Sequence, residues 1–381
     1  MTMEHYVAER TYDAEADRQV LDRADLDAPT WVLVARRFRR HRLGVVCAVF
    51  LAVIYAMLPF MDMIAPYDPN RFDENNIYAP PQGLYLYHQG EFIGLHTYRT
   101  ATEYDLATGL VKPVTYSDTL IPVRLFGICG DSYRFLGLIE GRFHVLCPPE
   151  DGPLYLLGSD RLGRDILSRI LHGARLSMTI GLIGVAVSFA IGLVLGGMAG
   201  YFGGWVDGTV QRLIEVFRSL PELPIWLALS AAVPITWGPV TVFFIISIIL
   251  GLLDWPGLAR AVRSKFLALR EEDYVRAAEL MGASSGRVIA AHMMPNFMSH
   301  LIASATLSIP SMILGETALS FLGLGLRPPA VSWGMMLNDA LNLSAVEIYP
   351  WILMPMIPVI LVVLAFSFVG DALRDAVDPY S

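Results

Sequence analysis

The chain has 381 residues, of which 54% are hydrophobic and only 17% are charged. Soluble proteins carry about 25% charged residues, so this composition cannot cover several water-exposed domains and predicts an integral membrane protein. The net charge of −8 argues against a nucleic-acid-binding protein, which needs a basic surface. Neither lysine, Lys112 or Lys265, follows a glycine, so the sequence contains no G-x-x-x-x-G-K-[ST] phosphate-binding loop.

The N-terminal part, residues 1–42, is predicted to be a cytoplasmic tail followed by a basic segment. Residues 1–30 are acidic and poor in large apolar side chains, which favours a loosely ordered tail. Residues 43–65 are apolar apart from Asp62 and are long enough to cross a bilayer. We expect this first span to be retained and not cleaved as a signal peptide, because some forty residues precede it.

Five further membrane-spanning helices are predicted, at residues 176–202, 209–233, 239–257, 293–315 and 349–370, of which the second and third are divided from the uncharged run 223–253. Pro234, Gly238 and Pro239 predict a turn between the third and fourth spans, and Pro310 predicts a kink in the fifth. The sequence therefore indicates an all-α polytopic membrane protein with six transmembrane helices.

Basic residues near the spans predict the orientation of the chain. Residues 328–348 contain no arginine or lysine. Basic side chains instead precede the first span and occupy the loop between spans four and five, at Arg36, Arg37, Arg39, Arg40, Arg42, Arg260, Arg263, Lys265, Arg270, Arg276 and Arg287. Six spans with both termini in the cytoplasm satisfy this distribution.

This topology places residues 66–157 outside the cytoplasm as an insertion before the core. Short alternating runs between glycines and prolines predict strands, so we expect a small β-rich extracytoplasmic subdomain. Cys129 and Cys147 both lie there, where an oxidising compartment permits a disulfide, although sequence alone leaves their pairing open. Residues 158–381 then form the core, with five transmembrane helices and a cytoplasmic loop at 258–295.

Small residues recur every fourth position along the second span, at Gly184, Ser188, Gly192, Gly196 and Gly200. Such a stripe lets another helix approach closely. Two interpretations remain open: helix packing within the chain, or the lining of a translocation path or subunit interface.

Charged residues near the spans are further candidates. Arg212, Glu215 and Arg218 follow one another at spacings of three and predict a structural ion cluster at the cytoplasmic rim, with a gate as the alternative. Glu316 either faces a solute path or marks the membrane boundary. The spacing of His292 and His300 does not predict a metal site, and no catalytic set of residues is recognisable.

Residues 271–296 carry the strongest pattern. Tyr274, Ala277, Ala278 and Met281 form an apolar stripe on a short helix, and Gly282 follows as its C′ residue. Ser284 or Ser285 is expected to cap a second helix that leads into the fifth span. The short helix either docks into a groove of another protein, with its alanines exposed, or lies on the membrane. Its acidic residues disfavour an anionic leaflet.

This loop resembles the pattern E-A-A-x3-G-x9-I-x-L-P of permeases in ATP-binding-cassette (ABC) importers. The chain keeps the spacing of this pattern at Arg276, Ala277, Ala278, Gly282, His292, Met294 and Pro295. Three of these residues differ from the pattern: arginine replaces the glutamate, histidine the isoleucine and methionine the leucine. Residues 158–165, 200–204, 319–325, 370–375 and Asp378-Pro379 are similar to the dipeptide, oligopeptide and nickel permeases. The resemblance covers residues 155–381 and the arginine-rich segment before the first span, and leaves the insertion at 65–155 unexplained.

The resemblance implies a type I ABC importer permease fold in the bacterial cytoplasmic (inner) membrane. It implies a coupling helix that contacts an ATPase subunit and includes Tyr274, Arg276, Ala277, Ala278, Glu279, Met281, Gly282, Ala283 and Pro295. The implied partners are a second homologous permease, two ATPase subunits that bind ATP and magnesium, an extracytoplasmic solute-binding protein and membrane lipid. The chain itself is then a transport subunit without enzymatic activity or a cofactor.

The predicted solutes are oligopeptides, and the long insertion keeps oligosaccharides open. An ion-coupled secondary transporter is the alternative, but it needs ionisable residues near the middle of the membrane. The middles of four predicted spans contain none. A membrane receptor or assembly factor would leave the 274–295 loop unexplained.

Overall fold

The computed structural model describes residues 30–105, 110–135, 139–149, 152–234 and 236–377. The tail predicted at 1–29, the Asp378-Pro379 motif and position 235 of the predicted turn lie outside these residues. The described part begins with α3 (Thr30–Arg40) and α4 (Arg42–Met57), followed by η1 (Leu58–Phe60), α5 (Met61–Ile64) and η2 (Glu74–Asn76).

After the strands the chain is again helical. The elements in order are α6 (Ile166–Phe202), α7 (Gly204–Ser219), α8 (Glu222–Ala231), α9 (Pro239–Leu269), α10 (Asp273–Leu280), α11 (Ser285–Arg287), the π-helix η3 (Val288–Met293), α12 (Met294–Phe321), α13 (Trp333–Leu337), η4 (Asn338–Leu341), α14 (Leu343–Ile348), η5 (Pro350–Leu353) and α15 (Met356–Val377).

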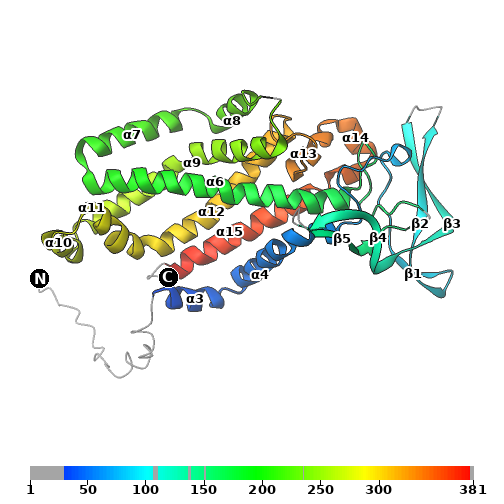
Figure 1. The fold of residues 1–381 in the computed structure, drawn as a ribbon, viewed down its shortest axis with the longest axis horizontal. Coiled ribbons are helices and arrows are strands. Elements are labelled where there is room, and N and C mark those ends of the chain that lie inside the picture. Colours follow the sequence, from blue (N-terminus) through cyan, green and yellow to red (C-terminus); the bar gives the residue numbers. More distant parts are fainter. Residues whose placement is uncertain (1–29, 106–109, 136–138, 150–151, 235, 378–381) are drawn as a thin grey trace, which may run out of the picture.

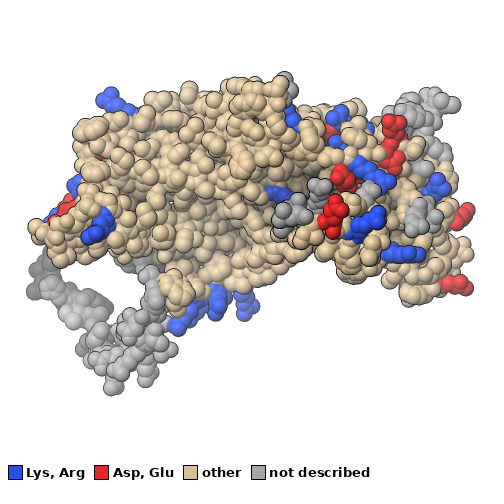
Figure 2. All heavy atoms as spheres, in the orientation of Figure 1, with Lys and Arg blue, Asp and Glu red and all other residues tan. Residues whose placement is uncertain are grey.

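Within the described residues, five helical segments are long and apolar enough to cross a membrane: Arg42–Ile64, Ile166–Phe202, Pro239–Leu269, Ser285–Phe321 and Pro350–Val377. They run along the long axis of the molecule (Figure 1). On the visible face, charged side chains gather mainly toward the two ends, and the middle is almost free of them (Figure 2). The predicted polytopic helical membrane architecture is confirmed.

The predicted third span, 209–233, is wrong as a single helix. It is divided into α7 and α8, because Leu220 is extended, with φ −99° and ψ 138°, and Pro221 follows it. The residue before a proline is sterically disfavoured in the helical region, and Pro221 lacks the N–H that would continue the helix. The two helices follow one another along one edge of the bundle (Figure 1).

The predicted strands are confirmed as two small antiparallel sheets. One sheet contains β1 (Tyr85–His88), β2 (Glu91–Asp105) and β3 (Leu110–Pro122), in that order. The other pairs β4 (Arg124–Phe135) with β5 (Ile139–Cys147), and a disulfide joins Cys129 to Cys147 across it. Both sheets lie at the end of the bundle opposite α10 (Figure 1).

Candidate functional site: the α10 end of the bundle

A Schellman motif ends α10 and sets the direction in which the chain leaves it. The amide of Gly282 donates to the carbonyl of Glu279 at 2.9 Å, and the amide of Ala283 donates to that of Ala278 at 3.1 Å. These are the two hydrogen bonds of this motif, and it requires a left-handed residue at C′. Gly282 has φ +83°, as the predicted glycine turn requires.

One face of α10 is anchored on the bundle. Val275 is fully buried and Ala278 is 2% exposed, so the predicted exposure of Ala278 is wrong. Both side chains pack into an apolar cluster formed with Val262, Phe266, Val288, Met293, Phe297 and Leu301 of α9, η3 and α12. Ala278 is buried and not exposed because residues on α9 and α12 cover its side of α10.

The other side of α10 is uncovered, and its C-terminal tip is apolar. Tyr274 is 40% exposed, Ala277 is also exposed, and Leu280 and Met281 are 89% and 81% exposed. Large apolar side chains at this end of a bundle normally contact lipid or another protein. The sequence stripe therefore located Tyr274, Ala277 and Met281 correctly on an exposed surface but missed Leu280.

Hydrogen bonds connect α10 to two long helices. Tyr201, at the end of α6, donates its hydroxyl to Glu279 Oε1 at 2.7 Å. Asn296 of α12 donates from Nδ2 to the Tyr274 hydroxyl at 2.9 Å. These two bonds join α10 to the end of α6 and the start of α12.

The junction between α10 and α12 contains the remaining loop residues. Ser284 occupies the N-cap of α11 without a side-chain capping bond, and Pro295 follows directly after the π-helix η3 at the start of α12. Arg276 is exposed and pairs with Glu271. Hydrogen bonding to Arg276 lowers the pKa of Glu271.

The small-residue stripe of α6 packs against α9 within the chain. A Cβ added at Gly196 would lie 2.4 Å from the carbonyl oxygen of Ala259, and one at Gly200 would lie 2.6 Å from Phe266 Cβ. Ser188 is buried and donates to Asp254 of α9 at 3.3 Å. Of the two interpretations, helix packing accounts for these contacts, which also extend to Gly184 and Gly192.

The predicted ion cluster of α7 is not formed. Arg212, Glu215 and Arg218 are exposed, and no ion pair joins them among the residues that the structure describes. The ion pair of this helix is instead Asp207 with Arg263 of α9, which the sequence analysis missed because 56 positions separate them. The hydrogen bond from Arg263 lowers the pKa of Asp207.

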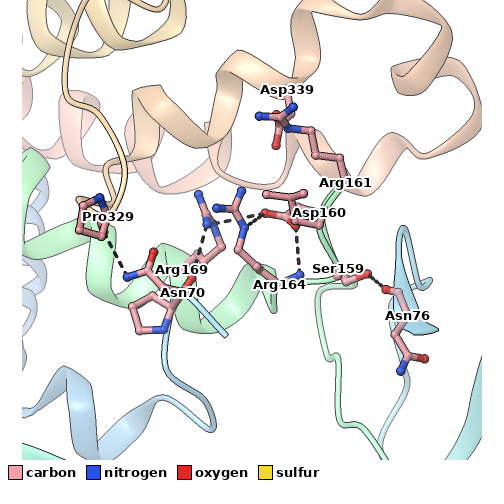
Figure 3. A network of polar contacts seen from close by, with 12 residues as sticks. Asn70, Asn76, Ser159, Asp160, Arg161, Arg164, Arg169, Pro329 and Asp339 are labelled. Carbon is pink, nitrogen blue, oxygen red and sulfur yellow. Dashed lines mark hydrogen bonds and ion pairs between the residues drawn. The ribbon is translucent and has the colours of Figure 1, made fainter. Parts of the chain in front are cut away.

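The opposite end of the bundle is held by a polar network (Figure 3). Arg164 donates to Asp160 at 2.7 Å, and the buried Arg169 approaches the same carboxylate oxygen at 3.6 Å. Arg161 pairs with Asp339 of η4 at 2.7 Å. The network ties the 158–165 segment, which the sequence analysis singled out, to the start of α6 and to the η4 region.

Glu316 belongs to the same end and is completely buried. Ser320 donates to Oε1 at 2.7 Å, and Ser177 of α6 donates to Oε2 at 3.4 Å. The backbone amide of Trp333 in turn donates to the Ser177 hydroxyl at 3.1 Å. Glu316 therefore connects α12 with α6 and α13 and is not exposed on a path surface of this chain.

The arrangement defines a class of protein: a polytopic helical membrane protein with a small β-sheet subdomain at one end and a short anchored helix with an exposed apolar tip at the other. Residues 192–380 match the family model of the binding-protein-dependent transport system inner membrane component. Residues 30–81 match the N-terminal TM domain of oligopeptide transport permease C. The five strands lie between these two ranges.

Relatives support the same assignment. The dipeptide transport system permease protein DppC of Alkalihalophilus pseudofirmus is 39% identical over 223 residues, which cover 58% of this chain and 71% of that protein. The oligopeptide transport system permease protein OppC of Mycobacterium bovis is 36% identical over 240 residues, covering 63% and 80%. A solved structure of the MetNI methionine ABC transporter matches with a TM-score of 0.42 and 20% identity over 55% of this chain and 96% of that chain.

The chain belongs to the family of inner-membrane components of binding-protein-dependent transport systems. This membership confirms the resemblance to ABC importer permeases and identifies a multi-pass inner-membrane transport protein.

Proposed function

We propose that this chain forms half of the translocation path of an ATP-driven importer and pairs with a second, similar permease. Two ATPase subunits bind at the α10 end, and an extracytoplasmic solute-binding protein delivers the solute at the opposite end. The observation that carries this proposal is the exposed apolar tip of α10, at Leu280 and Met281. ATP and magnesium bind the ATPase subunits and not this chain.

The contacts of α10 support a coupling role. Burying a leucine side chain contributes about 1.5–3 kcal/mol, so a groove that covers Leu280 and Met281 gains several kcal/mol. Val275 and Ala278 fix the other face of α10, so a moving ATPase subunit displaces the helix as a unit. Tyr201 and Asn296 then carry this displacement to α6 and α12, and rocking of the long helices changes which side of the membrane the path opens to.

The proposed orientation places the α10 end and both termini in the cytoplasm. The arginines of α3 lie at the same end of the bundle as α10 (Figures 1 and 2), in agreement with the excess of basic residues on cytoplasmic segments. The sheets then face an oxidising compartment, which suits the Cys129–Cys147 disulfide.

Peptides are the proposed solute class. The names of DppC and OppC, which assign dipeptide and oligopeptide transport to those relatives, support this choice. Oligosaccharides are the second candidate, because the strands between the two matched ranges form an additional outer surface. Uptake of labelled oligopeptides and oligosaccharides by cells that carry or lack this chain separates the two solute classes.

A pull-down from mild detergent tests the coupling assignment. Tagged wild-type protein is expected to recover ATPase subunits and a second permease, and Leu280→Glu is expected to lose the ATPase subunits. Leu343→Glu is the matched control, because Leu343 is 79% exposed on α14, away from α10. A wild-type chain that purifies alone and transports solute under an ion gradient would identify an ion-coupled transporter and overturn the proposal.

A further inference from the structure

A cavity of about 340 Å³ lies between α3 and the C-terminal part of α15. One water occupies about 30 Å³ in the liquid, so the cavity has room for a group much larger than a single water. Its lining consists of Arg37, Arg40, His41, Ala372, Asp375 and Ala376. Ala372 and Ala376 are buried and one turn apart on α15, and their small side chains leave this space open.

The charges around the cavity favour an anion. Arg37 and Arg40 provide two guanidinium groups and Asp375 provides one carboxylate, so the charged lining residues sum to a positive charge. His41 accepts a hydrogen bond from the Gly44 amide through Nδ1 at 3.2 Å. Its Nε2 therefore carries the ring proton and is a donor. Guanidinium groups and an imidazole N–H together suit the oxygens of a phosphate group.

The position of the cavity in the molecule indicates where this phosphate comes from. The membrane-spanning segment of α4 begins at Arg42, directly after the lining residues Arg40 and His41. Phospholipid headgroups lie at the end of such a span. Trp31 of α3 is 71% exposed, and tryptophan is enriched at membrane interfaces. Figure 2 shows basic side chains along the lower edge of the bundle, in the region where Figure 1 places α3 and the start of α4.

We infer that the cavity between α3 and α15 binds the phosphate of an anionic phospholipid headgroup. Basic pockets beside membrane-spanning helices hold such headgroups through charge and hydrogen bonds. The bound lipid bridges α3 to α15 and so fixes the basic segment against the end of the bundle. The inference depends on the chain spanning a bilayer and is independent of the ATPase partners and of the transported solute.

Native mass spectrometry of the full chain in detergent tests this site with added phosphatidylglycerol or phosphatidylcholine. We expect the wild-type chain to retain phosphatidylglycerol preferentially. Arg37→Gln/Arg40→Gln should weaken this binding by about tenfold or more, and the matched control Arg36→Gln/Arg39→Gln by about threefold or less. The control removes the same charge from the same helix but leaves the lining residues in place.

The Asp375→Asn variant separates an effect on the binding site from an effect of misfolding. Removing the acidic lining residue should strengthen phosphatidylglycerol retention, which a damaged fold would not do. Equal weakening in the two double variants, or equal retention of phosphatidylcholine by the wild type, would overturn the proposal. Competition by inorganic phosphate at the same concentration as the lipid would also overturn it, because the ligand would then be a soluble anion.

Discussion

The hydroxyl of Tyr201 donates a 2.7 Å hydrogen bond to the Glu279 carboxylate and so connects the end of α6 to α10. Hydrogen bonds to charged groups contribute about 1.5–3 kcal/mol when shielded, and less in an exposed setting such as this one. We expect Tyr201→Phe and Glu279→Ala each to reduce ATP-dependent uptake about two- to tenfold. Uptake by the double variant should be no lower than uptake by the poorer single variant, because both substitutions remove the same hydrogen bond. Fully additive losses in uptake would show that the two residues act separately.

Gly282 is expected to tolerate only residues that accept a left-handed backbone. A Cβ at this position meets no atom within 4 Å, so the penalty is conformational and amounts to about 1–2 kcal/mol per residue. Gly282→Leu should abolish solute uptake at near-normal protein levels, and Gly282→Asn should retain more uptake than Gly282→Ala.

Gly286→Ala is the matched control for Gly282, since it has equal space but no left-handed backbone. Uptake and membrane protein levels are measured together for all four variants. Normal uptake by Gly282→Leu would contradict the coupling role of this turn.

Gly196 is expected to be required for the stability of the α6–α9 pair. A Cβ there would lie 2.4 Å from the Ala259 carbonyl oxygen, which is backbone and cannot rotate away. Gly196→Val should lower the free energy of unfolding by about 1–3 kcal/mol or more, seen as a lower Tm in detergent. Gly208→Ala in α7 meets no atom within 4 Å and should leave the Tm unchanged or raise it.

Asp165 makes the stability of the N-terminal end of α6 dependent on pH. Its Oδ2 caps the helix by accepting from the Ser168 amide at 2.7 Å, and burial raises its pKa from 3.8 to about 6. Because the folded pKa is raised, the stabilising contribution of the protonated group is present below pH 3.8 and is lost as the pH rises through 6.

Asp165→Asn keeps an oxygen that caps α6 but does not ionise, so its contribution to stability does not fall as the pH rises. Its Tm relative to the wild type should therefore be higher at pH 8 than at pH 4.5. Asp165→Ala removes the cap and should lower the Tm at both pH values. An Asp165→Asn difference that is the same at both pH values would contradict the raised pKa.

The sequence predicted those features that depend on local chemistry. Apolar stretches located the membrane-spanning helices, and Gly282 after a periodic run predicted the end of α10. The division of 209–233 was missed because the predicted helix ran through Pro221, which disfavours a helical Leu220. The side of α10 to which Ala278 belongs depends on α9 and α12, and the Asp207–Arg263 pair joins distant segments. Such tertiary relationships leave no local pattern.

The segment Ser285–Phe321 is one helical rod of 37 residues, including its π-helical part, and spans about 55 Å. Its first turns pack against α10, and Glu316 near its other end is bonded to α6. Any free-energy coupling that this rod carries between its two ends is reciprocal. A ligand that binds at the end opposite α10 and favours one position of the rod changes the affinity of a partner for α10. That partner must change the affinity of the ligand by the same factor. Under the proposed function, a solute delivered at the end opposite α10 changes the affinity of the ATPase subunit for α10.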